Sequence, residues 1–213
     1  EISFKVKGVV RKGGLTVGYT GYGGSSHIGP ELQFGHVMGD CFEDPVLLIK
    51  TAWGGKSLFV DFRPPSSGGQ AGPCYKQMIE EVREALATLG DRPYRLAGLV
   101  WQQGWNDMCD KDAVPEYADN LVNLVKDLRT EFKVPQLPVV VGELGNGGPD
   151  AKGGMAEFRK QQEEGTTRIP NALFVKTSSF ARPPEMSPTP GHGHPWFGNA
   201  ERYFPIGHAL GQG

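Results

Sequence analysis

One stretch of the sequence combines a side chain suited to binding a reactive group with turn residues that would expose it. It reads Trp-Gln-Gln-Gly-Trp-Asn-Asp over residues 101–107, and its first residue, Trp101, is the last residue of an apolar run. In an open α/β sheet, ligands bind beyond the carboxyl ends of the strands. An amide held at such an end, as Asn106 would be, can donate a hydrogen bond to a developing oxyanion. Taken alone, the segment also fits an ordinary turn without a catalytic role.

Two further segments carry residues suited to the same chemistry. After a second apolar run, Gly54 and Gly55 would let the backbone approach a ligand and point N–H groups at it. Near the C-terminus, His192 and His194 lie in a glycine-rich frame ahead of a predicted helix, where an imidazole can act as a general base. The i, i+2 spacing of the two histidines also suits a metal site, but no third ligand is spaced to complete it. We therefore expect no metal and no cofactor.

The elements that must position these residues alternate along the chain. Four short apolar runs predict buried strands, and five amphipathic segments predict helices. The strands are expected at Val46–Lys50, Leu96–Trp101, Leu137–Gly142 and Ala172–Lys176. The helices are expected near residues 30–42, 78–89, 117–132, 155–164 and 199–210, and Pro205 should kink the last one or shift its start. This alternation is typical of an α/β protein with three α/β/α layers and one mostly parallel sheet that holds all four runs.

The first residues of the chain differ from the remainder. We divide the sequence into an N-terminal extension or loop region, 1–28, and an α/β/α domain, 29–213. Glu1–Arg11 alternates as an edge strand or hairpin would, and a glycine-rich stretch follows it. Because this opening does not resemble the first strand of a doubly wound sheet, we expect that strand to be missing. The segment Arg63–Gly72 is predicted to be a loop over the site and not a domain boundary.

Composition excludes several classes of protein. The 213 residues are 38% hydrophobic and 22% charged, as in a soluble single domain, and contain no run of about 18 apolar residues for a membrane span. A net charge of −2 without a cluster of Lys and Arg argues against nucleic acid as a partner. Cys41, Cys74 and Cys109 are too few for a disulfide scaffold, and we expect buried free thiols.

Taken together, four ordered blocks resemble the SGNH (GDSL-type) hydrolases, in the branch of the sialate O-acetylesterase-like and acetylxylan-esterase-like carbohydrate esterases. The blocks are Ile49–Leu58 (IKTAWGGKSL), Val100–Met108 (VWQQGWNDM), Val139–Gly147 (VVVGELGNG) and Gly191–Gly207. The resemblance implies an SGNH/flavodoxin-like α/β/α fold and serine-dependent hydrolysis of acetyl esters. It further implies an acetylated carbohydrate as substrate and an extracellular or periplasmic location.

The same resemblance assigns roles to individual residues. A glycine of the Gly54–Gly55 pair supplies an N–H group to the oxyanion hole, and Asn106 supplies a side-chain amide to it. His194 is the base that activates the nucleophile and later protonates the leaving alcohol, with His192 as the alternative. The family's GQSN-like serine turn is absent from these residues, and we expect it upstream of Glu1.

Two departures from the family pattern concern the histidine and its acidic partner. The family's histidine usually lies three residues before the equivalent of Gly198, a position that Pro195 occupies here. The usual acidic position, three residues before the histidine, is Gly191, and Glu143 and Glu185 are the candidate replacements.

The sequence leaves two rival functions open, as well as the sugar, the acyl group and the oligomeric state. One rival is a non-catalytic carbohydrate-binding or interaction protein that retained the fold and lost the triad. The other is an SGNH lipase or thioesterase. Tryptophans in three of the loops favour stacking on sugar rings over a long acyl groove. They are Trp53, Trp105 and Trp196.

Overall fold

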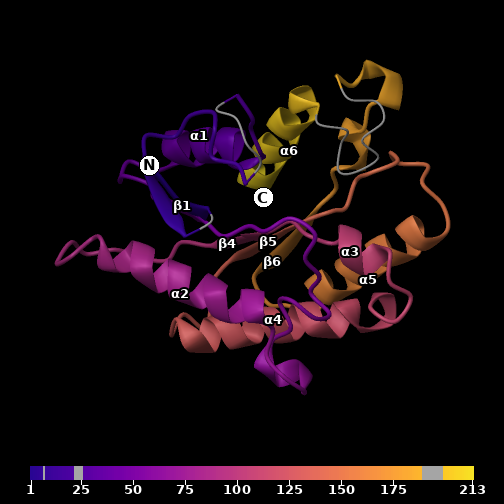
Figure 1. The fold of residues 1–213 in the computed structure, drawn as a ribbon, viewed down its shortest axis with the longest axis horizontal. Coiled ribbons are helices and arrows are strands. Elements are labelled where there is room, and N and C mark those ends of the chain that lie inside the picture. Colours follow the sequence, from indigo (N-terminus) through magenta and orange to yellow (C-terminus); the bar gives the residue numbers. More distant parts are fainter. Residues whose placement is uncertain (7, 22–25, 189–198) are drawn as a thin grey trace.

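The computed structural model describes residues 1–6, 8–21, 26–188 and 199–213. Helices lie on both sides of short, mostly parallel strands (Figure 1). The strands are β1 (Ile2–Val6), β2 (Val9–Gly13), β3 (Leu48–Lys50), β4 (Leu99–Trp101), β5 (Val139–Gly142) and β6 (Ala172–Val175). The α-helices are α1 (Glu31–Cys41), α2 (Pro73–Ala87), α3 (Trp105–Met108), α4 (Tyr117–Glu131), α5 (Gly154–Thr167) and α6 (Ala200–Gln212). Short 3-10 helices cover Pro65–Ser67, Val114–Glu116, Ser178–Phe180 and Pro184–Met186.

Backbone hydrogen bonds join the described strands into two sheets, with the orders β2-β1-β3 and β4-β5-β6. β1 runs antiparallel to β2 and parallel to β3, and the second sheet is parallel throughout. The α/β class with mostly parallel pairing is therefore confirmed. Within the described residues, the prediction that one sheet holds all four apolar runs is wrong, because β3 pairs with the N-terminal strand β1 and not with β4.

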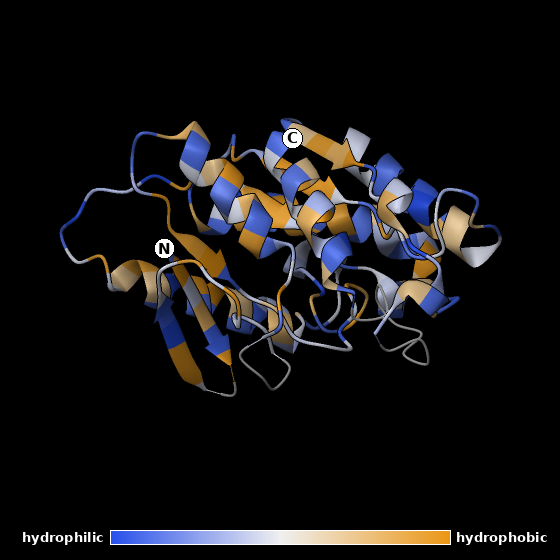
Figure 2. Cartoon of the chain, turned by 90° about the horizontal axis from the view of Figure 1, so that it is seen from above, coloured by the Kyte–Doolittle hydropathy of each residue, from blue (hydrophilic) through white to orange (hydrophobic). Residues whose placement is uncertain are grey.

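The β4-β5-β6 sheet is covered on both faces because alternate side chains of each strand point to opposite sides. Trp101 and Val141 pack into the main core with side chains of α2, α4 and α5. Val100 and Val140 pack on the other face against α6. Figure 2 shows hydrophobic strands between helices that carry hydrophilic residues on their outer sides. This arrangement gives the three α/β/α layers.

Helix α6 is held over its face of the sheet by close packing against α1. A Cβ atom on Gly207 would lie 2.2 Å from the carbonyl oxygen of Pro30, so the two helices approach more closely than a side chain would permit. The side chain of Asn199 caps the helix by accepting a hydrogen bond from the backbone N–H of Glu201 at 3.0 Å. α6 therefore begins at Ala200, and Pro205 lies inside it without shifting its start.

The N-terminal residues form the hairpin that the alternation over Glu1–Arg11 predicts, as β1 and β2. β1 lies inside its sheet and not at the edge, because it also pairs with β3. Ile2 and Phe4 are almost fully buried with Tyr19 in a small separate core. The Nζ atom of Lys5 donates to Glu84 of α2 at 2.7 Å, which ties the hairpin to the following region. The domain boundary between residues 28 and 29 stays a prediction.

The segment Arg63–Gly72 does not lie over the candidate site, and that prediction is wrong. Its 3-10 helix packs on the side of α4, where Ser66 donates to the carboxylate of Asp127. The Nδ2 atom of Asn123, also on α4, donates to the hydroxyl of Ser67 at 3.1 Å. Figure 1 shows this turn beyond α4, on the side away from the strands.

The three cysteines are free thiols in different environments. Cys74 is buried in α2, and burial raises the pKa of its thiol. Cys41, the last residue of α1, and Cys109, the residue that follows α3, are both exposed. The expectation of buried thiols is right for Cys74 and wrong for the other two.

A core substitution tests the packing of α4 on the sheet. Leu121 is 0% exposed in the main core, and Leu121→Ala should lower the free energy of unfolding by about 2–5 kcal/mol through lost burial and a cavity. The matched control is Leu173→Ala at a side chain that is 48% exposed, which should change it by less than about 0.5 kcal/mol. Guanidinium unfolding monitored by circular dichroism measures both, and equal losses would contradict this packing.

Candidate active site

The loops that follow β3 and β4 are hydrogen-bonded to each other through one carboxylate. Asp107 of α3 accepts the backbone N–H of Leu58 on Oδ2 and that of Phe59 on Oδ1, both at 2.9 Å. Gln103 donates from Nε2 to Asp107 Oδ2 at 2.5 Å and to the carbonyl oxygen of Lys56 at 2.9 Å. Two segments more than forty residues apart in the sequence are thereby fixed side by side.

Asp107 is fully buried, and its environment acts on its ionisation in two directions. Burial raises the pKa of Asp107, because a charged carboxylate loses its hydration. The hydrogen bonds from Gln103 and from the backbone amides of Leu58 and Phe59 act against burial and lower it. Burial is the larger effect. The two carboxylate oxygens accept all three of these hydrogen bonds, so the side chain has a positioning role.

Two further buried side chains connect the loop after β4 to its surroundings. The hydroxyl of Tyr117 accepts a hydrogen bond from Trp101 Nε1 at 3.2 Å and donates to the carbonyl oxygen of Gln103 at 3.1 Å. Gln162 of α5 donates to the carbonyl oxygens of Gln103 and Gly142 and accepts the backbone N–H of Leu144 at 2.8 Å. These hydrogen bonds therefore fix the position of the turn after β4 relative to the turn after β5.

Gly104 lets the chain turn from β4 into α3 against the core. Its φ angle is +155°, a conformation that a side chain disfavours. A Cβ atom there would lie 2.4 Å from Cε1 of Phe158, which is itself fully buried. A glycine at this position allows the short helix that carries Asn106 to pack directly on α5.

The predicted oxyanion-hole residues belong to the two loops that Asp107 joins. Gly54 and Gly55 form an exposed turn just before residues 56–59, the segment that is hydrogen-bonded to Gln103 and Asp107. The φ angle of +69° at Gly55 favours glycine. Asn106 is half-buried in α3, next to Asp107, and its amide makes no hydrogen bond to another described residue. His194 and His192 lie outside the described residues, so their convergence with Gly54, Gly55 and Asn106 stays a prediction.

Glu143, a candidate acidic partner for the histidine, already has other partners. Its Oε2 atom accepts the backbone N–H groups of Thr177 at 2.8 Å and Ser178 at 2.7 Å. Its Oε1 atom lies 3.7 Å from Nε of Arg159. These contacts tie the turn after β5 to the turn after β6. The other candidate, Glu185, is exposed in the 3-10 helix Pro184–Met186.

With this geometry in hand, comparison with known proteins identifies the family. Residues 16–188 match the family described as "Carbohydrate esterase, sialic acid-specific acetylesterase". The chain belongs to this family of carbohydrate esterases. A probable carbohydrate esterase from Arabidopsis thaliana is 26% identical over 99 residues, which are 43% of this chain and 36% of the plant protein. The chain therefore aligns with only about a third of that relative's length.

Two solved structures share the fold of this member of the carbohydrate esterase family. The X-ray structure of an Arabidopsis thaliana protein matches with a TM-score of 0.66 and 20% identity, over 90% of this chain and 69% of the other. The crystal structure of a carbohydrate acetylesterase from Xanthomonas citri matches with a TM-score of 0.64 and 19% identity, over 85% of this chain and 39% of the other. At these identities the likeness establishes the fold, which agrees with the resemblance in the sequence.

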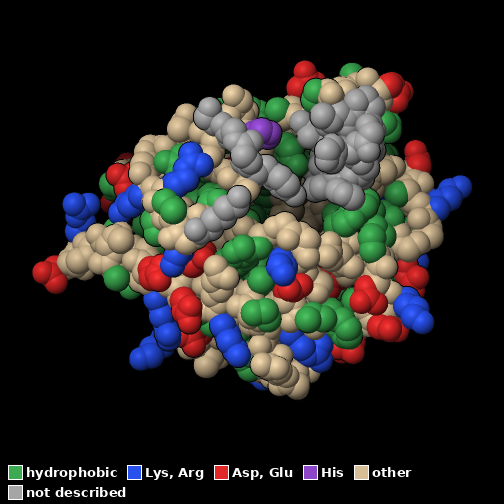
Figure 3. Space-filling view, in the orientation of Figure 1, with side chains coloured by type: hydrophobic (Ala, Val, Ile, Leu, Met, Phe, Trp, Pro, Cys, Tyr) green, Lys and Arg blue, Asp and Glu red, His purple; other side chains and the backbone are tan. Residues whose placement is uncertain are grey.

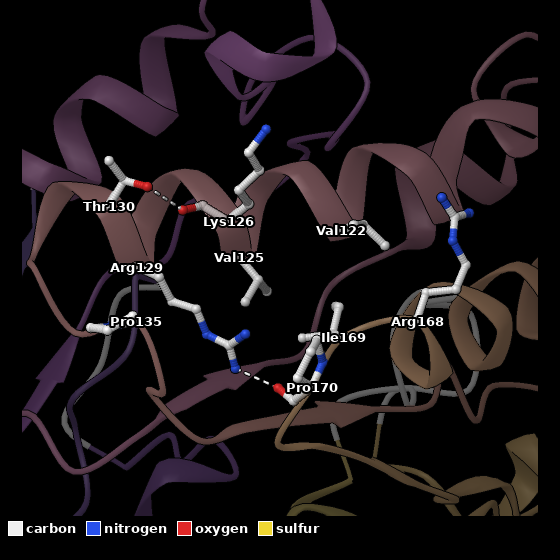
Figure 4. A pocket seen from close by; sticks show the side chains of 9 residues that line it. All are labelled: Val122, Val125, Lys126, Arg129, Thr130, Pro135, Arg168, Ile169 and Pro170. Carbon is white, nitrogen blue, oxygen red and sulfur yellow. Dashed lines mark hydrogen bonds between the residues drawn. The ribbon is translucent and has the colours of Figure 1, made fainter.

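Two cavities of the protein lie at opposite ends of the β4-β5-β6 sheet. One, of about 470 Å³, is lined by Trp105 and by the loops after β5 and β6, so it lies at the carboxyl ends of the strands. The other, of about 330 Å³, is lined by α4 and by residues 168–170, which precede β6. Figure 4 shows Arg129 crossing this second cavity to reach the carbonyl oxygen of Pro170. Only the first cavity adjoins the candidate active site.

Three of the described histidines, His27, His36 and His208, are exposed, and His208 lies in α6. In the described part of the chain, no group of three or more His, Cys, Asp or Glu side chains is placed to hold a metal ion. Among those same residues, no helix has both the length and the apolar character of a membrane span. Figure 3 shows acidic and basic side chains interspersed over the described part of one face.

No role was predicted from the sequence for the residues that hold the site together. These are Asp107, Gln103, Tyr117, Gln162 and Arg159. Asp107 and Gln103 lie within the block already singled out, and an acidic residue beside the oxyanion amide was an available signal. Gln162 and Arg159 lie on the predicted helix α5, where nothing in the local pattern separates them from solvent-exposed polar residues.

Replacing the buried carboxylate tests its positioning role. Asp107→Asn places an NH₂ group opposite N–H donors, so we expect the free energy of unfolding to fall by about 1–3 kcal/mol. Hydrogen exchange should accelerate at the amide of Leu58 or Phe59 that faces the new NH₂ group, because the single oxygen of asparagine replaces only one of the two carboxylate oxygens. The exposed control Asp112→Asn should change neither quantity. Unchanged protection in Asp107→Asn would contradict the role.

A pH titration tests the burial of Tyr117. Burial raises the pKa of its phenol well above 10, whereas an unfolded tyrosine ionises near pH 10. Above pH 10 the folded state therefore binds more protons than the unfolded state, and the free energy of unfolding should fall as pH rises. Tyr117→Phe should reduce this slope, measured by urea unfolding at successive pH values. Tyr94→Phe, at a side chain that is 56% exposed, should retain the wild-type slope.

Proposed function

We propose that this protein is a serine-type carbohydrate O-acetylesterase, which removes acetyl groups from acetylated sugars. The observation that carries the proposal is the set of hydrogen bonds from Leu58 and Phe59 to Asp107. They hold the loop that contains Gly54 and Gly55 against the helix that contains Asn106. A glycine N–H and an asparagine amide so arranged can donate to one oxyanion, and each donor typically lowers the barrier by about 3–4 kcal/mol.

The nucleophile is proposed to come from a strand that is not among these 213 residues. No serine here lies in a GQSN-like turn. The hydroxyl of Ser57 is hydrogen-bonded within its own turn, where it donates to the carboxylate of Asp61 and accepts the backbone N–H of Val60. Ser178 is buried, and its backbone N–H donates to Glu143.

The two sheets support a specific place for that strand. Within the described residues, β3 and β4 each have a strand partner on one edge only. The loops that follow them are nevertheless hydrogen-bonded to each other. A parallel strand between β3 and β4 would complete one sheet, and its carboxyl end would emerge between the Gly54–Gly55 turn and Asn106. A serine at that end would lie next to both oxyanion donors.

In the proposed reaction, the serine oxygen attacks the acetyl carbonyl carbon while His194 accepts its proton. The carbonyl oxygen becomes an oxyanion, which Asn106 Nδ2 and a backbone N–H of Gly54 or Gly55 bind. Collapse breaks the bond to the sugar oxygen, which takes the proton from His194 and leaves as an alcohol. Water, deprotonated by the same histidine, then hydrolyses the acetyl-serine to acetate. The histidine is proposed as His194, with His192 as the alternative.

Activity measurements test the roles of Asn106 and His194. In the protein that includes a serine turn, hydrolysis of p-nitrophenyl acetate and acetylated sugars is expected, and the 213 residues alone should hydrolyse them poorly. His194→Ala and Asn106→Ala should each lower kcat/KM by at least about a hundredfold. His208→Ala, at an exposed position in α6, is the matched control and should leave the rate unchanged.

Three outcomes would count against parts of this proposal. If His192→Ala abolishes activity while His194→Ala does not, the assignment of the base is wrong. An unchanged rate in Asn106→Ala would remove this amide from the oxyanion hole. Binding of acetylated glycans without turnover, by a protein with an intact serine, would favour the non-catalytic carbohydrate-binding function.

A further inference from the structure

The residues on either side of the segment that carries the candidate histidines are hydrogen-bonded to each other. This histidine segment, residues 187–198, follows the turn Pro184–Met186 and precedes α6. Asn199, directly before α6, donates from Nδ2 to the carbonyl oxygen of Met186 at 3.2 Å. Its Oδ1 atom accepts the backbone N–H of Glu201, so one buried amide both caps the helix and binds the chain before the histidine segment.

Arg202 joins the same two parts of the chain a second time. It lies in the first turn of α6, and it is only 2% exposed. Its Nη2 atom donates to the carbonyl oxygens of Arg182 and Pro183. Burial, followed by the nearby charge of Arg182, lowers the pKa of the Arg202 guanidinium. A buried charge is costly unless hydrogen bonds offset it, and these two carbonyl oxygens contribute to that offset.

The two links lie at the carboxyl edge of the β4-β5-β6 sheet. Arg182 and Pro183 line the cavity of about 470 Å³ together with Trp105. The helix from which the links extend is itself fixed, because Ile206 and Leu210 of α6 are buried against the sheet. The links therefore attach the chain on both sides of the histidine segment to a rigid element next to this cavity.

We propose that Asn199 and Arg202 are positioning residues of the reaction, which keep the catalytic histidine within reach of the nucleophile by fixing the chain on both sides of it. Both His194 and its alternative, His192, lie in the histidine segment. A base must lie within hydrogen-bond reach of the group that it deprotonates, and a displacement of about 1 Å can lower a rate about a hundredfold. The inference rests on the proposed function, because it concerns the histidine of that reaction.

Variants that remove the links are tested in the protein that includes a serine turn. Asn199→Ser keeps an oxygen that can cap α6 and removes the donor to Met186, whereas Arg202→Met removes the guanidinium and keeps a long side chain. Each should lower kcat for p-nitrophenyl acetate by about tenfold or more and change KM by less than about twofold. Arg202→Lys, which keeps a donor group, should retain more activity than Arg202→Met. Arg92→Met, at an exposed position, is the control and should leave kcat unchanged.

A double-mutant cycle separates positioning of the histidine from a general loss of structure. In a His194→Ala background, Asn199→Ser or Arg202→Met should lower the remaining rate by less than about twofold, because the group that they position is already absent. If His192 proves to be the base, His192→Ala takes its place in the cycle. Thermal unfolding establishes that each variant is folded, and Arg202→Lys replaces Arg202→Met if the latter is not. The proposal is overturned if both substitutions lower the rate as much in the histidine variant as in the wild type, or if both retain the wild-type kcat.

Hydrogen exchange tests the two links without requiring catalysis. The backbone N–H groups of Met186 and Ser187 are hydrogen-bonded within their own turn. Their exchange should accelerate in Asn199→Ser and Arg202→Met, because the turn loses its attachment to α6, and should stay unchanged in Arg92→Met. Exchange at the wild-type rate in both link variants would overturn the proposal.

The two readouts separate failure of the positioning role from failure of the proposed function. Faster exchange in the link variants of a protein that never hydrolyses acetyl esters would overturn the esterase proposal and leave the two links standing. An active esterase in which both link variants retain the wild-type kcat would overturn the positioning role alone.

Discussion

The buried carboxylate of Asp107 is the constraint on which the arrangement of the candidate active site depends. A carboxylate without solvent contact is costly unless hydrogen-bond donors surround it, and here they come from Gln103 and from the backbone of Leu58 and Phe59. Those backbone groups lie in the loop after β3, which belongs to a different sheet from β4, the strand that precedes Asp107. Satisfying one charge therefore sets the distance between the Gly54–Gly55 turn and Asn106.

Each of the remaining loops at this edge is fixed by a similar buried polar side chain. Gln162 joins the turns after β4 and β5, and Glu143 joins those after β5 and β6. Arg159 holds the loop that carries Asn146. Groups that bind a transition state must be preorganised, and supporting hydrogen bonds provide that rigidity. The helices on both faces of the sheet add the packing that keeps these side chains buried.

Much of this fold could be predicted because its signals are local. Apolar runs and helical periodicity placed β3 to β6 and the long helices within a few residues, and the ordered blocks indicated the esterase family. The pairing of β3 with β1 could not be predicted, since register between distant strands leaves no local trace. The same holds for the turn at Arg63–Gly72, whose position depends on contacts with Asp127 and Asn123 of α4. For Asp107, its place beside Asn106 was a local signal, but its contacts with the backbone of Leu58 and Phe59 could not be predicted, because those residues are distant in the chain.

The central claim is that the loops joined by Asp107 form one oxyanion site, and a trapped reaction intermediate tests it most directly. The measurement is a crystal structure of the whole protein treated with a phosphonate ester, whose phosphonyl oxygen takes the place of the oxyanion. The account predicts that this oxygen accepts hydrogen bonds from Asn106 Nδ2 and from the backbone N–H of Gly54 or Gly55, at about 2.7–3.1 Å. A phosphonyl oxygen bound by other groups, with the Asn106 amide directed away from it, would contradict the account.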